Sequence, residues 1–186
     1  MANKVKFGLK GVVVAPITYG ADNSITYETP FAIPGAVNLT LDQNGEQTDF
    51  YADNTKYFTT SANQGYTGSL EMALISEKFK TDVLGMTKDT NGVLVENKDD
   101  KVKDFALGFI VDGDDKNTKH WFLQVSEQRP SVSSQTIETS KTPITETINI
   151  TASARITDGE VKYSCEDGSA AYANFLNSVY ETTISR

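Results

Sequence analysis

The sequence predicts a mainly β fold, a sandwich or barrel of mostly antiparallel strands with one short helix and a C-terminal helix. Alternation of apolar and polar residues recurs about every ten residues, turn-forming residues separate the alternating segments, and helical spacing of apolar residues is confined to two short stretches. The length of 186 residues fits one domain, and no linker rich in Gly, Ser or Pro divides it. We therefore expect residues 1–186 to form a single domain, with 182–186 as a polar tail.

The predicted strands are segments whose apolar side chains occupy alternate positions, which places them on one face of a sheet. Pro30 interrupts the second segment and marks it as an edge or irregular strand, because proline cannot donate a ladder hydrogen bond. In chain order the segments are 4–10, 25–33, 36–41, 46–52, 66–74, 105–111, 121–125 and 144–156, followed by a short one at 161–163.

Turn signals predict two hairpins. Asn44-Gly45 is the residue pair most typical of a two-residue hairpin loop, so we expect the segments before and after it to pair with each other. The polar run 113–117 similarly joins 105–111 to 121–125.

A short helix is predicted directly after the segment 66–74. Ser76 can cap its first turn, and Phe79, Val83 and Leu84 fall on one side of it. Gly85 stands where a left-handed residue ends a helix.

A second helix, of about three turns, is predicted near the C-terminus. Tyr172, Phe175, Leu176 and Val179 follow helical spacing, and Ser169 is a plausible N-cap. This helix should pack one face against the sheet.

Charge and hydropathy limit the classes of function. The chain carries 17 basic and 25 acidic residues, a formal net charge of −8, which argues against binding that neutralises nucleic-acid phosphates. No apolar run approaches the ~18 residues that span a bilayer, and the first residues lack the apolar stretch of a signal peptide. We expect no membrane contact and no export.

Residues suited to catalysis or metal binding are few. His120 is the single histidine and Cys165 the single cysteine, so a nucleophilic pair would require these two to meet in space and no internal disulfide is possible. The acidic turns at 89–92 and 112–115 lack the spacing of an EF-hand. The sequence predicts no catalytic, cofactor-binding or metal site and favours a scaffold over an enzyme.

The polar stretch 51–66 carries four aromatic residues, which is unusual for a solvated loop. They are Tyr51, Tyr57, Phe58 and Tyr66. Such residues contact either the domain's own core or a partner subunit, and the sequence leaves both open.

Several short motifs, in order along nearly the whole chain, resemble the major tail proteins of long-tailed, non-contractile bacteriophages. The least similar segments are 97–104 and 158–186. The motifs are Asn3–Gly11, Ala15–Thr18, Ile33–Val37, Phe50–Asn54, Asn63–Tyr66 with Gly68, Ser76–Phe79, Asn91–Leu94 and Arg129–Val132.

The resemblance implies a tail tube protein, a β-sandwich flanked by a helix. Copies of such a protein close into hexameric rings, and the rings stack head to tail into a hollow tube that conducts DNA into the host. In these tubes a long loop between consecutive strands reaches the neighbouring ring. Here that loop is 53–64, and the expected inter-ring contact residues are Asp53, Tyr57, Phe58, Gln64 and Tyr66.

The resemblance also implies partners and a place. The lumen should hold a tape-measure protein and then let double-stranded DNA pass without binding it. Initiator and terminator proteins should lie at the ends of the tube. Assembly would occur in the host cytoplasm and the product would be part of the virion. Asp42, Glu46 and Asp49 are candidates for an acidic lumen wall that repels DNA, although a solvated outer hairpin explains them as well.

A different class of function remains compatible with a β-sandwich, namely an adhesin or a carbohydrate- or receptor-binding module. Such a module should form a closed small oligomer with an aromatic binding site. The single tryptophan, Trp121, shares its parity with Leu123 and Val125, which favours a place in the core over a sugar platform.

Overall fold

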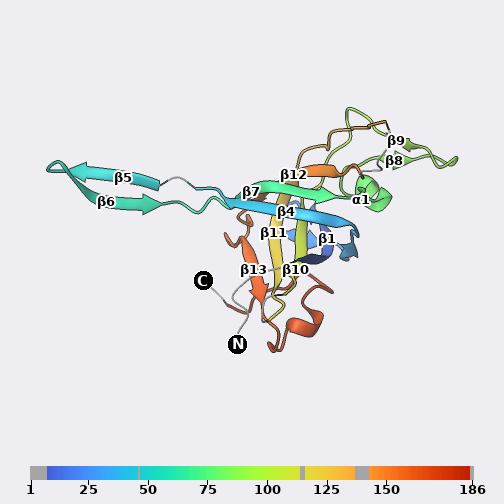
Figure 1. Ribbon diagram of the computed structural model, residues 1–186. Coiled ribbons are helices and arrows are strands. Elements are labelled where there is room, and N and C mark those ends of the chain that lie inside the picture. Colours follow the sequence, from blue (N-terminus) through green and yellow to red (C-terminus); the bar gives the residue numbers. More distant parts are fainter. Residues whose placement is uncertain (1–7, 46, 114–115, 137–142, 185–186) are drawn as a thin grey trace.

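One continuous nine-stranded sheet carries the fold, in the order β2-β1-β10-β11-β12-β7-β4, with β13 pairing with β11 and β3 with β1. All the pairs of this sheet are antiparallel. In the computed structural model, which describes residues 8–45, 47–113, 116–136 and 143–184, the half made of β4, β7 and β12 crosses over the half made of β1, β10 and β11 (Figure 1). The mainly β, sandwich-like fold expected from the sequence is confirmed.

The bounds of the main-sheet strands are β1 (Leu9–Tyr19), β2 (Ile25–Tyr27), β3 (Phe31–Ala32), β4 (Ala36–Gln43), β7 (Tyr66–Met72), β10 (Phe105–Val111), β11 (Lys119–Glu127), β12 (Glu146–Ser153) and β13 (Lys162–Cys165). Two small sheets stand apart from it, β5 (Gln47–Ala52) with β6 (Thr55–Ser61) and β8 (Thr87–Lys88) with β9 (Leu94–Val95).

The main core lies between the two halves of the sheet. Leu70, Met72, Ile148 and Ile150 project into it from β7 and β12, as their alternation predicted. From the other half it receives buried side chains of β1, β10 and β11, namely Val12, Val14, Phe105, Leu107, Phe109, Phe122 and Val125.

Strand β1 was not predicted as a whole. The expected segment 4–10 falls largely on residues 1–7, outside the described residues, and the strand instead runs on to Tyr19. Its second half has no clear alternation because both of its faces are covered, so that Val14, Ala15 and Ile17 are all buried.

The predicted hairpin around Asn44-Gly45 is wrong. Strand β4 pairs with β7, and β5 pairs with β6, so residues 36–72 form a single long hairpin whose turn is at Asp53-Asn54. Both turn residues have positive φ, 52° and 59°, as a tight two-residue turn requires. Asn44 instead continues the ladder beyond β4, because its amide donates to the carbonyl of Gly65 over 2.8 Å. The hairpin predicted between 105–111 and 121–125 is confirmed by the pairing of β10 with β11.

Helix α1 (Glu77–Asp82) confirms the first helix prediction. The amide of Phe79 donates to the Ser76 hydroxyl, and Gly85 has a φ of +77°. Phe79, Val83 and Leu84 are buried in the main core, so this short helix closes one end of the sandwich.

The prediction of a three-turn C-terminal helix is wrong. The structure has a single 3₁₀ turn there, η1 (Tyr172–Asn174), with Ala171 rather than Ser169 at its N-cap position. The main-chain carbonyls that a continuing α-helix would use already have other donors. Lys119 Nζ donates to the carbonyl of Tyr172 over 2.6 Å, and Trp121 Nε1 donates to that of Phe175, also over 2.6 Å. The segment packs on the outer face of β10 and β11 and forms a second core there.

Arg155 fastens the end of this segment to the sheet. Its side chain is buried, it forms ion pairs with Asp158 and Glu181, and it donates hydrogen bonds to the hydroxyls of Tyr27 and Tyr163. A buried guanidinium needs such partners to offset its lost hydration.

Candidate assembly surfaces

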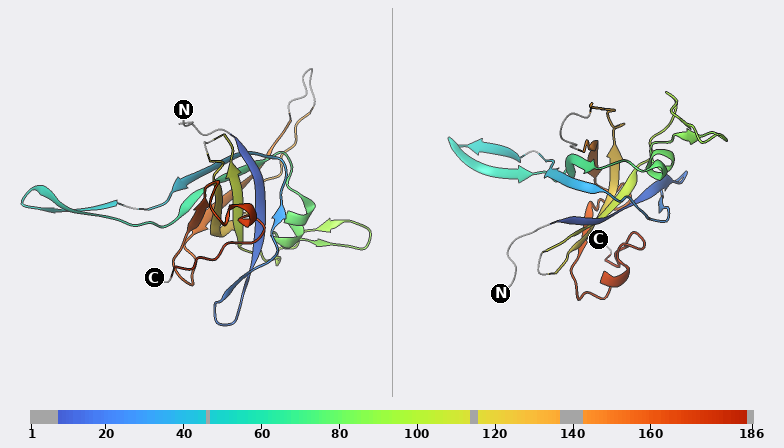
Figure 2. Two further views of the ribbon diagram at one scale, coloured as in Figure 1. Left: turned by 90° about the horizontal axis from the view of Figure 1, so that it is seen from below. Right: turned by 45° about the vertical axis from the view of Figure 1, so that its right-hand side comes forward.

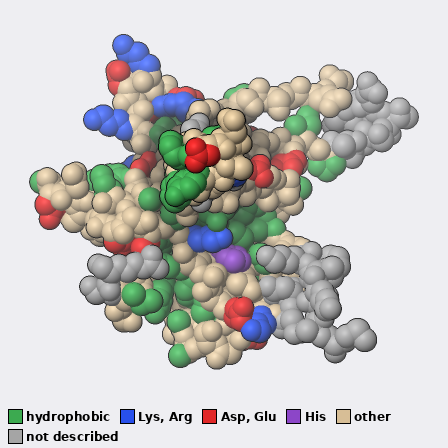
Figure 3. All heavy atoms as spheres, turned by 90° about the vertical axis from the view of Figure 1, so that its left-hand side faces the viewer, with side chains coloured by type: hydrophobic (Ala, Val, Ile, Leu, Met, Phe, Trp, Pro, Cys, Tyr) green, Lys and Arg blue, Asp and Glu red, His purple; other side chains and the backbone are tan. Residues whose placement is uncertain are grey.

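The β5–β6 hairpin, residues 47–61, projects far from the rest of the molecule, and we call it the arm. Figures 1 and 2 show it extending alone from one end of the sandwich. Four of its aromatic side chains are largely exposed: Phe50 at 60%, Tyr51 at 63%, Tyr57 at 77% and Phe58 at 60%. Figure 3 looks at the molecule from the side of the arm, where hydrophobic side chains gather beside an acidic one. Exposed aromatic groups in this number are typical of surfaces that contact a partner, which makes the arm a candidate for one.

A β-bulge gives Tyr57 a special position. Phe50 pairs with Phe58 and Tyr51 with Lys56, so Tyr57 is the residue without a directly opposite partner. Lys56 forms a 2.8 Å ion pair with Asp49 across the two strands. The arm is thus held by its own ladder and cross-strand pairs.

The root of the arm is tightly built. The amide of Gln64 donates to the carbonyl of Asn44 over 2.8 Å, which extends the β4–β7 ladder toward the arm. A Cβ on Gly65, whose φ is +93°, would lie 1.9 Å from the carbonyl oxygen of Ala152, and one on Gly45 would lie 1.9 Å from that of Ala62. Only glycine fits either position without backbone movement.

The expected contact residues occupy three different settings. Asp53, Tyr57 and Phe58 lie on the arm, and Gln64 is exposed at its root. Tyr66 is half-buried, with its ring edge-on to Phe122 at 5.2 Å between centroids, so its ring already serves the chain's own core.

The outer surface of β4, β7 and β12 is polar, and we call it the polar face. These three strands contain no Lys or Arg. Acidic groups on it are Asp42 and Glu71, whereas Glu146 accepts a 2.6 Å hydrogen bond from the amide of Ile75. The side chains stand in three rows across the strands: Asn38, Glu71 and Thr147; Thr40, Ser69 and Asn149; and Asp42, Thr67 and Thr151.

The three acidic candidates for a lumen wall are separated by the fold. Asp42 is exposed on the polar face, and Asp49 lies on the arm, where Lys56 and the Thr59 hydroxyl contact its carboxylate. Glu46 lies outside the described residues. Glu71 on the polar face could not be singled out from sequence, because it stands within an ordinary alternating strand.

His120 and Cys165 do not form a nucleophilic pair. Cys165 is opposite Lys119 in the β11–β13 register and His120 is opposite Ser164, so the two side chains project to opposite faces of the sheet. Cys165 is buried in the second core, and the His120 ring lies 5.2 Å from that of Phe109. Within the described part of the chain, His, Cys, Asp and Glu side chains form no group of three that could hold a metal ion.

Trp121 is fully buried, so its ring is unavailable as a sugar platform. Across the residues that the structure describes, no helix has the length and apolar character needed to cross a membrane.

Glu127 is a buried acid that no sequence pattern singles out. Its two carboxylate oxygens are buried and have no hydrogen-bond partner among the described residues. Burial raises the pKa of this carboxyl to about 8.

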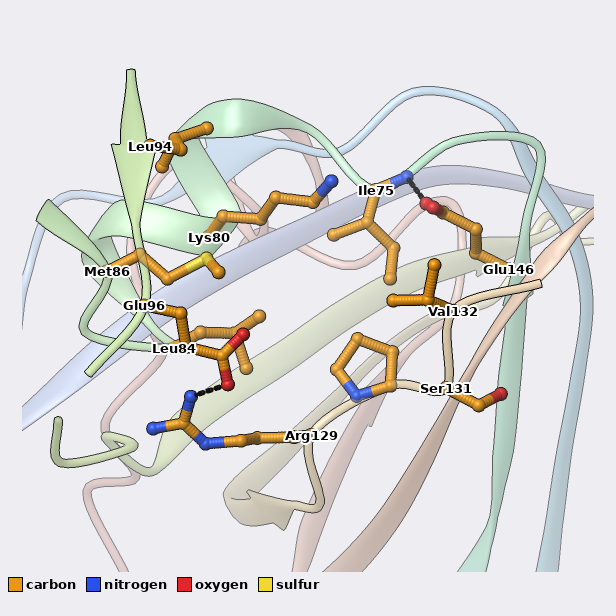
Figure 4. A pocket seen from close by; sticks show the side chains of 11 residues that line it. Ile75, Lys80, Leu84, Met86, Leu94, Glu96, Arg129, Ser131, Val132 and Glu146 are labelled. Carbon is orange, nitrogen blue, oxygen red and sulfur yellow. Dashed lines mark hydrogen bonds and ion pairs between the residues drawn. The ribbon is translucent and has the colours of Figure 1, made fainter. Parts of the chain in front are cut away.

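A cavity of about 180 Å³ lies at the end of the molecule opposite the arm, between α1, the β8–β9 sheet and the segment 129–132 (Figure 4). Its walls are largely apolar, and Arg129 Nη1 donates to Glu96 Oε1 at its edge. Val132, which lines it, is 99% exposed.

Comparison with known proteins identifies the family. No curated protein matches the chain. A model of the family described as phage tail tube protein matches residues 2–160, which cover all the main-sheet strands except β13 and include the arm. This match agrees with the mainly β sandwich and with the resemblance of the sequence motifs. The chain therefore belongs to the phage tail tube protein family, and it is a structural component of a phage tail.

Proposed function

We propose that this chain closes into hexameric rings that stack head to tail, and that the resulting tube conducts DNA during ejection. Membership of the family shows that the chain is a tail tube protein. The ring, the direction of stacking and the passage of DNA are inferences from the surfaces described above.

The polar face is the observation that carries the proposal. Double-stranded DNA passes a wall without sticking when the wall offers no cations to pair with its phosphates. Lys and Arg are absent from all three strands of this face, and Asp42 and Glu71 add negative charge to it. We propose that the polar face lines the lumen, with Asp42 as an acidic wall residue and with Glu46 and Asp49 further along the same hairpin.

Ring closure is supported by the edge of the sheet. Among the described strands β4 pairs only with β7, so its other edge offers unpaired backbone groups over eight residues. An exposed edge of this length is a template for pairing with another chain. We propose that a neighbouring subunit covers it, so that the polar faces of six subunits join into one wall.

Stacking is supported by the arm. Its exposed aromatic side chains make few contacts within the chain, and it extends beyond the sandwich that would form the ring. We propose that Asp53, Tyr57, Phe58 and Gln64 contact the next ring, with Tyr66 supporting the root. When a surface on one end of a subunit binds the other end of an identical copy, the assembly can extend without limit.

Partners follow from this assembly. We propose that the lumen holds a tape-measure protein before DNA enters and that initiator and terminator proteins lie at the ends of the tube. We also propose that assembly takes place in the host cytoplasm. The coarser statement, that the protein self-assembles with other tail components, follows from the family.

The test is negative-stain electron microscopy of the purified protein at low and high concentration, with light scattering to give the mass in solution. We expect hollow rings and tubes. The double substitution Tyr57→Ala and Phe58→Ala should abolish stacking, whereas Ile156→Ala, at a comparably exposed apolar residue outside the arm, should not. A compact dimer or trimer that never polymerises would contradict the proposal and favour a binding module.

A further inference from the structure

The cavity beside α1 has the size and lining of a receptor for one aromatic ring. Its volume is about 180 Å³, and an apolar protein cavity of about 150 Å³ is known to accept benzene. The apolar lining residues are Ile75, Leu84, Met86, Leu94, Pro130 and Val132.

Exposed apolar residues also flank the lining residues of the cavity in the sequence. Val132 is 99% exposed, and next to the lining residues along the chain lie Leu74 and Val95, exposed at 67% and 45%. Lys80, Glu96, Arg129, Ser131 and Glu146 complete the lining, so this end of the molecule presents an apolar hollow that also carries polar and charged groups, an arrangement that an amphipathic side chain of a partner would cover.

The arm of another copy supplies the matching group. Tyr57 is the most exposed aromatic residue of the arm, and the β-bulge leaves it without an opposite partner, whereas Phe50 and Phe58 oppose each other. Of the four exposed rings, Tyr57 therefore gains most from burial elsewhere.

The arm lies at one end of the molecule in all three ribbon views, and α1 and the β8–β9 sheet, which contribute to the cavity lining, lie at the other (Figures 1 and 2). A copy placed end to end with another would bring the arm of the first to the cavity of the second. The arm reaches far enough to act outside its own subunit, since six residues of β5 alone span roughly 17 Å at about 3.3 Å per residue.

We infer that the Tyr57 ring of one copy inserts into the cavity lined by Leu84, Met86, Leu94 and Val132 of the next copy. This inference rests on the proposed stacking of rings and names its receptor site. The tyrosine hydroxyl then lies at the polar edge, where it can donate a hydrogen bond to the Glu96 carboxylate that pairs with Arg129. The interface is heterologous: one copy gives the ring and the other gives the cavity.

Cysteine crosslinking tests the contact directly. The variant carrying Thr55→Cys and Val132→Cys keeps the Tyr57 ring and should form an intermolecular disulfide ladder under mild oxidation, because both positions are exposed and each copy can link to two others. Mixing the two single variants should give a single crosslinked dimer. The matched control combines Ile156→Cys with Val132→Cys, keeps one partner of the pair, and should give no ladder. Native Cys165 is buried and serves as the internal background.

A second variant tests the cavity without cysteines. Val132→Phe fills the mouth of the cavity with a ring of its own chain, and it should raise the protein concentration needed for stacking at least tenfold while leaving single rings intact. A tenfold change corresponds to about 1.4 kcal/mol. Circular dichroism of each variant confirms that the subunit is folded.

The outcomes separate the two ideas. A ladder from the 55/132 pair together with weakened stacking of Val132→Phe supports the receptor site. Stacked rings that give no ladder, or that tolerate Val132→Phe, overturn the receptor site and leave the tube function standing. If the wild-type chain forms neither rings nor tubes, the proposed function and this inference fall together.

Discussion

The indole nitrogen of Trp121 donates a 2.6 Å hydrogen bond to the main-chain carbonyl of Phe175, and this contact joins the centre of the sheet to the C-terminal segment. Trp121 is fully buried, and Phe175 packs in the same cluster. The hydrogen bond ties the main chain of the segment to the sheet, so it helps to fix the position of the segment.

Replacing Trp121 by Phe should therefore destabilise the subunit by about 2–4 kcal/mol, because the smaller ring leaves a cavity and the Phe175 carbonyl loses its donor. Urea unfolding measures the loss. Hydrogen exchange should show it first in 172–181, the segment that the indole holds. Unchanged protection there would show that apolar packing alone fixes the segment.

The raised pKa of Glu127 predicts an unusual pH dependence of the free energy of unfolding. The pKa of its carboxyl is about 8 in the folded chain, against 4.5 for an ordinary glutamate, so between these values the folded state binds more protons than the unfolded state. The free energy of unfolding should therefore fall as the pH rises from 4.5 to 8, at up to about 1.4 kcal/mol per pH unit.

Glu127→Gln should remove this slope and raise stability at pH 8, as measured by urea unfolding across the pH range. The opposite effect, from Asp82 and Asp158, is confined to acid conditions: their lowered pKa values give stability that is lost below about pH 4. A wild-type curve that is flat from pH 5 to 8 would show that the Glu127 carboxylate reaches water.

Gly65 should tolerate no side chain. Gly65→Ala places a Cβ 1.9 Å from the Ala152 oxygen at a φ of +93°, and it should cost about 3 kcal/mol or more, with displacement of the arm root. Gly159→Ala is the matched control: φ is +77° but nothing lies within 4 Å of the new Cβ, so it should cost about 1 kcal/mol. Equal losses in chemical denaturation would mean that backbone conformation, and not the close contact, dominates at Gly65.

A basic polar face should trap DNA. Tubes of the variant with Thr147→Lys and Asn149→Lys should retain short double-stranded DNA in a nuclease-resistant form, while tubes with Gln at both positions should not. Retention should weaken by a factor of ten or more between 50 and 200 mM salt, since each cation releases counterions from the phosphates (about 10³ for six contacts). DNA that binds but is digested would place this face on the outside of the tube.

Local sequence patterns predicted correctly those strands and the helix whose structure depends mainly on neighbouring residues. The alternation of β7 and β12 and the Ser76 and Gly85 signals around α1 all depend on neighbouring residues, and the structure confirms them. The aromatic residues of 51–66 were also singled out from the sequence, and Tyr51, Tyr57 and Phe58 are exposed on the arm, although the strand character of β6 was missed.

Long-range contacts decided the rest. Asn44-Gly45 is a turn signal that the pairing of β4 with β7 overrides, and the C-terminal helical spacing yields to donors from Lys119 and Trp121. The cavity could not have been found from sequence, because its lining combines residues of 75–96 with residues of 129–132 and with Glu146, which are apart in the sequence.

The two-stranded ladder of the arm has a consequence for the evolution of the tube. Side chains alternate between the two faces of a strand, so the arm keeps its pattern only if each strand gains or loses residues in pairs. Each such step changes its reach by roughly 7 Å. A lineage that keeps this pattern without a further bulge is therefore expected to change the length of its arm, and with it the spacing of its rings, in steps.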